Sequence, residues 1–134
     1  MPLKGGLPEE KSGAERRESY RLTHAVTVRS RRFPGNRAIA RDVSSTGIRV
    51  VGGGVSAKLA ASPLLMKGEQ FEIALDLDLI QQEITLPAEV MWVRHFDEKA
   101  EFEAGLRFIE VTEEKRRILA QYMGAVAESL RRFL

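Results

Sequence analysis

Two short polar segments near the start of the chain combine side chains that suit ligand binding. The first contains Arg17 and Arg21, which are four positions apart, so a helical turn would place both guanidinium groups on one side. In an irregular segment the same two side chains could approach a ligand from two directions. Guanidinium groups match phosphate oxygens bidentately and stack on flat rings. This segment therefore has the chemistry needed to bind a phosphate-bearing partner.

The second segment runs from Asp42 to Gly47. In an extended chain Asp42 and Ser44 share a face, and Gly47 allows another group to approach the backbone closely. A carboxylate can accept hydrogen bonds from the N1–H and the exocyclic amine of guanine, while arginine can donate to guanine O6 and N7. A ligand with guanine bases and phosphates would use both segments. Taken singly, each also fits a plainer interpretation, namely surface arginines and an Asp/Ser turn.

The basic side chains are concentrated in the first third of the chain. Residues 1–41 carry ten basic and four acidic side chains, a net charge of +6, whereas the remaining 93 carry eleven and fifteen, a net charge of −4. The formal net charge of +2 for all 134 residues hides this asymmetry. A cationic first third indicates a phosphate-bearing or acidic partner, although a solvated basic surface would give the same counts.

The sequence offers little support for catalysis or metal binding. Its lack of cysteine excludes disulfides, a zinc ribbon and a thiol nucleophile. His24 and His95 have no partner at metal-ligand spacing. The run Gly52-Gly53-Gly54 lacks the Lys-Ser/Thr of a phosphate-binding P-loop and is interpreted as a turn or bulge. Asp76 and Asp78 are expected on a solvated strand face. We therefore expect no enzymatic activity, no metal and no cofactor.

The elements that must position the two segments are mostly strands. After Thr112, a good N-cap, apolar residues at intervals of three and four predict an amphipathic helix. Several strands followed by one helix indicate a small antiparallel barrel or sandwich sealed by that helix. Residues 55–66 are less regular. Apolar alternation predicts strands over residues 22–28, 37–43, 48–51, 70–79, 83–93 and 104–109.

Length and composition fit one domain, since most domains hold about 100–150 residues. Residues 1–14 mix Pro, Gly, Lys and Glu and predict a flexible leader, so the expected domain covers residues 15–134. No apolar run reaches the roughly 18 residues needed to span a bilayer, and the N-terminus lacks the apolar core of a secretory signal. We expect a cytoplasmic protein that does not insert into membranes.

The ordered pair of segments resembles the RxxxR and (D/N)xSxxG motifs of PilZ domains, bacterial receptors for cyclic di-GMP. Residues 17–21 match the first motif and residues 42–47 match the second. The resemblance continues through residues 89–93, residues 104–108 and the terminal helix, and it covers residues 15–134. It implies a six-stranded antiparallel β-barrel with a C-terminal α-helix.

The resemblance also implies roles for single residues. Arg17 and Arg21, in the segment before the barrel, would fold over cyclic di-GMP. Arg16 occupies the position before the motif, where family members with arginine tend to favour an intercalated pair of ligand molecules.

In the second motif, Asp42, Ser44 and Gly47 would form the loop that recognises the base. Trp92 could offer a flat contact near the ligand, although its alternating strand favours a place in the barrel core.

The leading hypothesis is a cyclic di-GMP receptor whose Arg-rich N-terminal segment becomes ordered on binding and presents a surface to an unidentified protein partner. An alternative is a PilZ-like interaction adaptor that does not depend on nucleotide, but such domains usually lack one or both motifs. A third reading, non-specific nucleic-acid binding, rests only on the basic first third and predicts affinity that falls steeply with salt. The acidity of the remainder argues against it, so no nucleic-acid partner is expected.

Overall fold

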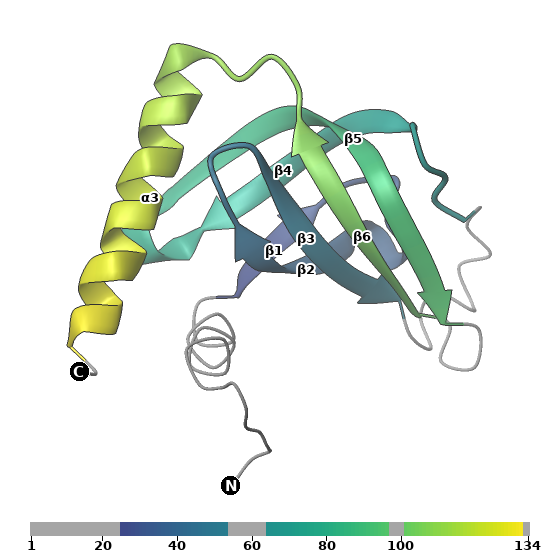
Figure 1. Ribbon diagram of the computed structural model, residues 1–134, viewed down its shortest axis with the longest axis horizontal. Coiled ribbons are helices and arrows are strands. Elements are labelled where there is room, and N and C mark those ends of the chain that lie inside the picture. Colours follow the sequence, from purple (N-terminus) through teal and green to yellow (C-terminus); the bar gives the residue numbers. More distant parts are fainter. Residues whose placement is uncertain (1–24, 54–63, 97–100, 133–134) are drawn as a thin grey trace, which may run out of the picture.

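The alternating apolar segments form a six-stranded barrel, with one helix beside one of its ends (Figure 1). The computed structural model describes residues 25–53, 64–96 and 101–132. The elements are β1 (Val26–Arg29), β2 (Arg37–Val43), β3 (Gly47–Gly53), β4 (Gln70–Leu77), β5 (Gln82–Phe96), β6 (Glu101–Phe108) and helix α3 (Glu113–Arg131). The predicted fold class, an antiparallel six-stranded barrel followed by a helix, is confirmed.

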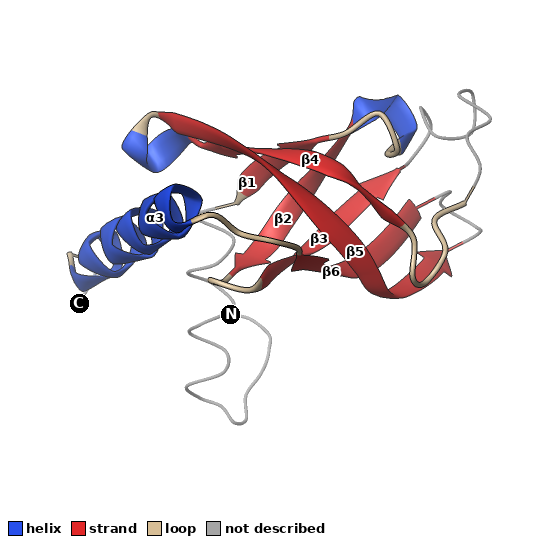
Figure 2. Cartoon of the chain, turned by 90° about the horizontal axis from the view of Figure 1, so that it is seen from above, coloured by secondary structure: helices blue, strands red, loops and turns tan. Residues whose placement is uncertain are grey.

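The barrel closes because β1 pairs with both β2 and β4 in the strand order β1-β2-β3-β6-β5-β4 (Figure 2). Every pairing is antiparallel. The long strands β4 and β5 alternate as predicted, and their inward residues fill the core. Burying one such Leu, Ile or Val side chain contributes about 1.5–3 kcal/mol. The fully enclosed core side chains include Val28, Val50, Ile73, Leu75, Leu77, Leu86 and Val90.

The connection between β4 and β5 differs from the prediction. The alternating pattern predicts a strand to residue 79, but β4 ends at Leu77 and residues Asp78–Ile80 form a 3₁₀ turn. Gln81 then takes a left-handed conformation, with φ 58°, which leads directly into β5. Asp78 consequently lies outside the strand and does not share a strand face with Asp76. Both carboxylates are solvent-accessible, as expected.

Two register shifts interrupt the regular alternation, one in β2 between Ala40 and Asp42 and one in β5 between Val90 and Trp92. At a bulge an extra residue is inserted, so the following side chains change face. Met91 and Trp92 are therefore both exposed, and Trp92 retains 39% of its accessible surface. The prediction from periodicity that Trp92 lies in the barrel core is therefore wrong, because the alternating pattern does not account for the bulge.

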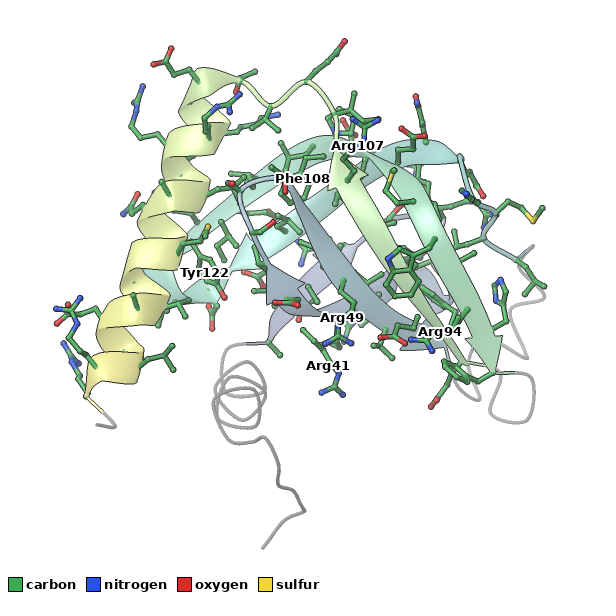
Figure 3. All side chains as sticks on the ribbon, in the orientation of Figure 1. Arg41, Arg49, Arg94, Arg107, Phe108 and Tyr122 are labelled. Carbon is green, nitrogen blue, oxygen red and sulfur yellow. The ribbon has the colours of Figure 1, made fainter. Side chains whose placement is uncertain are left out.

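Helix α3 begins where the sequence predicts. The hydroxyl of Thr112 accepts a hydrogen bond from the Lys115 amide at 3.2 Å, and two acidic residues occupy the first turn, where they complement the helix dipole. Leu119 and Tyr122 are the buried residues of the helix, and Tyr122 extends from its barrel-facing side (Figure 3). Burial raises the pKa of the Tyr122 hydroxyl. The helix thus closes one end of the barrel through a small apolar face.

Among the described residues, no helix combines the length and the apolar character that crossing a bilayer requires.

Candidate ligand-binding site

The turn between β2 and β3 is organised by Ser44. Its hydroxyl accepts hydrogen bonds from the amides of Thr46 and Gly47 at 3.2 and 3.1 Å. The same hydroxyl lies 3.2 Å from the Gly47 carbonyl, to which it donates, and the Ser44 amide donates to that carbonyl at 2.9 Å. Serine hydroxyls stabilise tight turns in this way. Ser44 therefore shapes the loop that the sequence analysis assigned to base recognition.

Gly47 begins β3 and touches the neighbouring strand β6. A Cβ atom at this position would lie 2.3 Å from the carbonyl oxygen of Leu106, which is a backbone atom and cannot move aside cheaply. Gly47 is not among the residues with positive φ, so close packing, rather than an unusual backbone conformation, requires glycine here.

An open cavity of about 410 Å³ lies on the outer wall of the barrel beside this turn. It brings together Asp42, Ser44, Gly47 and Trp92, four of the residues that the sequence analysis singled out. Trp92 reaches the cavity from β5 because of the bulge that turns it outward. The remaining lining residues are Thr46, Ile48, Arg49, Met91, Gly105, Leu106 and Arg107.

Arginines on β3 and β5 share one carboxylate beside this cavity. Glu103, on β6 between them, accepts hydrogen bonds from the guanidinium groups of Arg49 at 2.6 Å and Arg94 at 3.0 Å. The Glu103 side chain retains only 14% of its accessible surface, whereas Arg94 is exposed. The guanidinium carbon of Arg94 lies 5.7 Å from the centroid of the Trp92 ring, a cation–π distance. Figure 3 shows Arg49 and Arg94 on the same side of the barrel.

Two further charged contacts complete this wall. Arg107 pairs with Glu89 at 2.6 Å, and Arg49 lies 4.0 Å from the Asp42 carboxylate. The sequence did not single out Arg49, Arg107, Glu89 or Glu103, because the strand order that aligns them is not visible in the sequence. Outward positions on predicted strands were the one signal that could have identified them.

The remaining predicted site residues, Arg16, Arg17 and Arg21, lie outside the described residues. Within the parts of the chain that the structure describes, no group of three or more His, Asp or Glu side chains is placed to hold a metal ion. The cavity therefore offers hydrogen-bonding groups, paired charges and an indole ring.

The family model of the PilZ domain matches residues 15–125. The chain belongs to the PilZ domain family. The match includes both predicted motifs and all six strands of the barrel. No curated protein matches the chain.

Solved structures confirm the PilZ fold. YcgR from Escherichia coli in complex with c-di-GMP is 14% identical with a TM-score of 0.60, over 81% of this chain and 43% of that one. MrkH from K. pneumonia in its apo state is 16% identical with a TM-score of 0.62, over 83% and 50%. The PilZ domain of YcgR with c-di-GMP is 15% identical with a TM-score of 0.57, over 81% and 84%. The chain thus spans about half the length of the first YcgR chain and of the MrkH chain.

Proposed function

We propose that this PilZ domain is a receptor for cyclic di-GMP and has no catalytic role. The observation that carries the proposal is the convergence of Asp42, Ser44, Gly47 and Trp92 on one open cavity. The first three belong to the second family motif, and the fourth comes from a strand distant in sequence. Similar structures of YcgR contain c-di-GMP, which supports the same ligand class here.

The chemistry of the cavity suits a guanine base. Its volume of about 410 Å³ falls in the range of about 300–1,000 Å³ that small-molecule sites occupy. Asp42 supplies a carboxylate that can accept from the N1–H and the amine of guanine. The exposed indole of Trp92 supplies a face on which a base can stack. The barrel wall thus provides recognition of the base.

The phosphates require cations from elsewhere in the chain. On the described wall, Arg49, Arg94 and Arg107 are balanced by Asp42, Glu89 and Glu103, so the formal charge of these six groups is zero. A cyclic dinucleotide carries two negative charges. We propose that Arg17 and Arg21, together with Arg16, bind the phosphates.

The register of β1 supports this assignment. Val26 pairs with Ala40, so β1 begins beside the end of β2 that leads to Asp42. We propose that the Arg-rich segment becomes ordered over the nucleotide and thereby presents a new surface to a protein partner.

Calorimetry with cyclic di-GMP tests the receptor function. Arg17→Ala and Arg21→Ala should each weaken binding by about 1.5–3 kcal/mol, the value of a charge-assisted hydrogen bond, or about 10- to 150-fold. Arg117→Ala, on the exposed side of α3, is the matched control and should bind like the wild type. Absence of wild-type binding at ligand concentrations on the order of tens of micromolar would refute the proposal.

Hydrogen exchange tests the ordering step. Amides of residues 15–24 should gain protection when cyclic di-GMP is added to the wild type and should not gain it in Arg17→Ala. A partner that depends on this change should be retained by the immobilised protein only with the nucleotide. Equal retention with and without nucleotide would contradict the signalling step.

A further inference from the structure

The indole of Trp92 occupies space that a side chain at position 105 would need. Trp92 on β5 is the register partner of Gly105 on β6. A Cβ atom built on Gly105 would lie 2.2 Å from Nε1 of the indole and 2.6 Å from its Cε2. Contacts below about 3 Å do not occur between a real Cβ and its neighbours. The present position of the indole is therefore possible only because residue 105 has no side chain.

The backbone at position 105 gives no separate reason for glycine. Gly105 lies within β6 and is not among the glycines with positive φ. The three atoms closest to a Cβ at this position all belong to the Trp92 ring, so the indole is the first obstacle that a side chain would meet. Glycine in a strand interior otherwise weakens the strand through its entropy and lack of packing. Glycine occurs in strands where another group must approach the backbone closely, as the Trp92 indole does here.

Arg94 restricts the same indole from another direction. Its guanidinium carbon lies 5.7 Å from the ring centroid, and the guanidinium donates a hydrogen bond to Glu103 at 3.0 Å. Glu103 is mostly buried and also holds Arg49, so it is itself anchored across two strand pairs. The indole thus packs against Gly105, which has no side chain, and lies near the guanidinium group of Arg94.

We propose that Gly105 is a positioning residue for ligand recognition, which seats the Trp92 indole against β6 so that the ring lines the cavity. Arg94 and Glu103 keep the ring in that orientation. The ligand class is a flat heteroaromatic base, and this part of the proposal rests on the proposed function. The seating of the indole by Gly105 is independent of any ligand.

Fluorescence of the free protein tests the seating directly, because Trp92 is the only tryptophan of the chain. In Gly105→Ala the indole must leave its seat, so we expect a shifted emission maximum and altered quenching by acrylamide. Gly124→Ala is the matched control, because a Cβ there meets nothing within 4 Å. Its emission should equal that of the wild type. An unchanged emission and quenching in Gly105→Ala would overturn the proposal.

Calorimetry then tests the role in recognition. Gly105→Ala should weaken cyclic di-GMP binding about 5- to 150-fold, the range that loss of one base–aromatic stack spans, while Gly124→Ala should not weaken it. Unchanged affinity in Gly105→Ala would overturn the positioning role. If the wild type binds no cyclic di-GMP, the proposed function fails, and the fluorescence result still decides whether Gly105 seats the indole.

A double-mutant cycle covers the case in which Gly105→Ala does not fold. When Trp92 is first replaced by alanine, the added methyl group has no indole to displace. Trp92→Ala/Gly105→Ala should therefore fold like Trp92→Ala alone, with urea unfolding followed by circular dichroism. If Gly105→Ala destabilises the protein as much in the Trp92→Ala background as in the wild type, the backbone at position 105 requires glycine for another reason. The proposal is then wrong.

Discussion

Replacement of Ser44 by alanine tests whether this residue acts first as an organiser of the β2–β3 turn. The variant loses the hydroxyl that accepts from the Thr46 and Gly47 amides and that donates to the Gly47 carbonyl. The backbone hydrogen bond from the Ser44 amide to the same carbonyl, at 2.9 Å, is retained. The turn should therefore still form, but with fewer constraints on its shape.

The expected cost in stability follows from the exposure of the turn. An intramolecular hydrogen bond contributes about 0.5–1.5 kcal/mol net, and the lower values apply where water replaces the lost partner. Because Ser44, Ser45 and Thr46 are all exposed, we expect Ser44→Ala to lower the free energy of unfolding by about 0.5–1.5 kcal/mol in total. The loosened loop should also weaken cyclic di-GMP binding by about 1–1.5 kcal/mol, or roughly 5- to 10-fold.

Ser45→Ala is the matched control for this prediction. It removes the same hydroxyl from the next residue, which makes no hydrogen bond with its side chain among the described residues. Urea unfolding gives the stability of both variants, and calorimetry gives their affinity. If the two variants unfold at the same urea concentration, the Ser44 hydroxyl does not hold the turn and the reasoning is refuted. If only the affinity of Ser44→Ala falls, its hydroxyl acts on the ligand rather than on the loop.

Three further predictions concern the parts of the fold that support the site. Leu119→Ala should lower the free energy of unfolding by about 2–5 kcal/mol, because this side chain of α3 is fully buried. Met123→Ala, at a position that is 38% exposed, should cost far less. Equal costs in urea unfolding would contradict this packing. Burial raises the pKa of Tyr122, so the hydroxyl ionises more readily in the unfolded chain than in the folded one. The contribution of this group to the free energy of unfolding is therefore intact below about pH 10 and is lost as the pH rises further. Tyr122→Phe should remove that part of the alkaline loss of stability, and an identical pH profile would exclude it. Glu103→Gln should lower the free energy of unfolding by about 1–2 kcal/mol. This is less than the value of two charge-assisted hydrogen bonds, because one of the two arginine partners is well exposed. If the variant and the wild type have the same urea unfolding midpoint at low salt, the carboxylate is dispensable.

The fold was predictable because the longest runs of core side chains, in β4 and the first part of β5, alternate regularly. In β4 the apolar positions fall on one face through Leu77, and in β5 the same period runs to Val90. The Thr112 cap likewise marks the true start of α3. Local propensity and burial agree in these elements, so the pattern leaves few alternatives.

The arrangement of the site was only partly predictable. A local motif singled out Asp42, Ser44 and Gly47, which line the candidate cavity, whereas for Trp92 the periodicity favoured a buried position over the exposed one that it has. The bulge after Val90 is hidden because Trp92 continues the apolar period of the preceding residues, and it is this bulge that turns Trp92 outward. Glu103 shows a similar difficulty, because its two arginine partners come from strands that are neighbours of β6 only in the closed barrel.

The fold changes the meaning of the charge asymmetry along the chain. Two basic residues of the first third are paired with carboxylates of the remainder: Arg29 with Glu83 and Arg32 with Glu69. The cations of the cavity wall are paired as well. The excess of +6 in residues 1–41 is therefore partly neutralised by the acidic strands and does not by itself make a phosphate site. If the ligand is a dianion, the wall can supply contacts to its bases but little net attraction. The proposed roles of Arg17 and Arg21 follow from this balance as well as from their motif, and salt should weaken wild-type binding more than it weakens binding by Arg17→Ala.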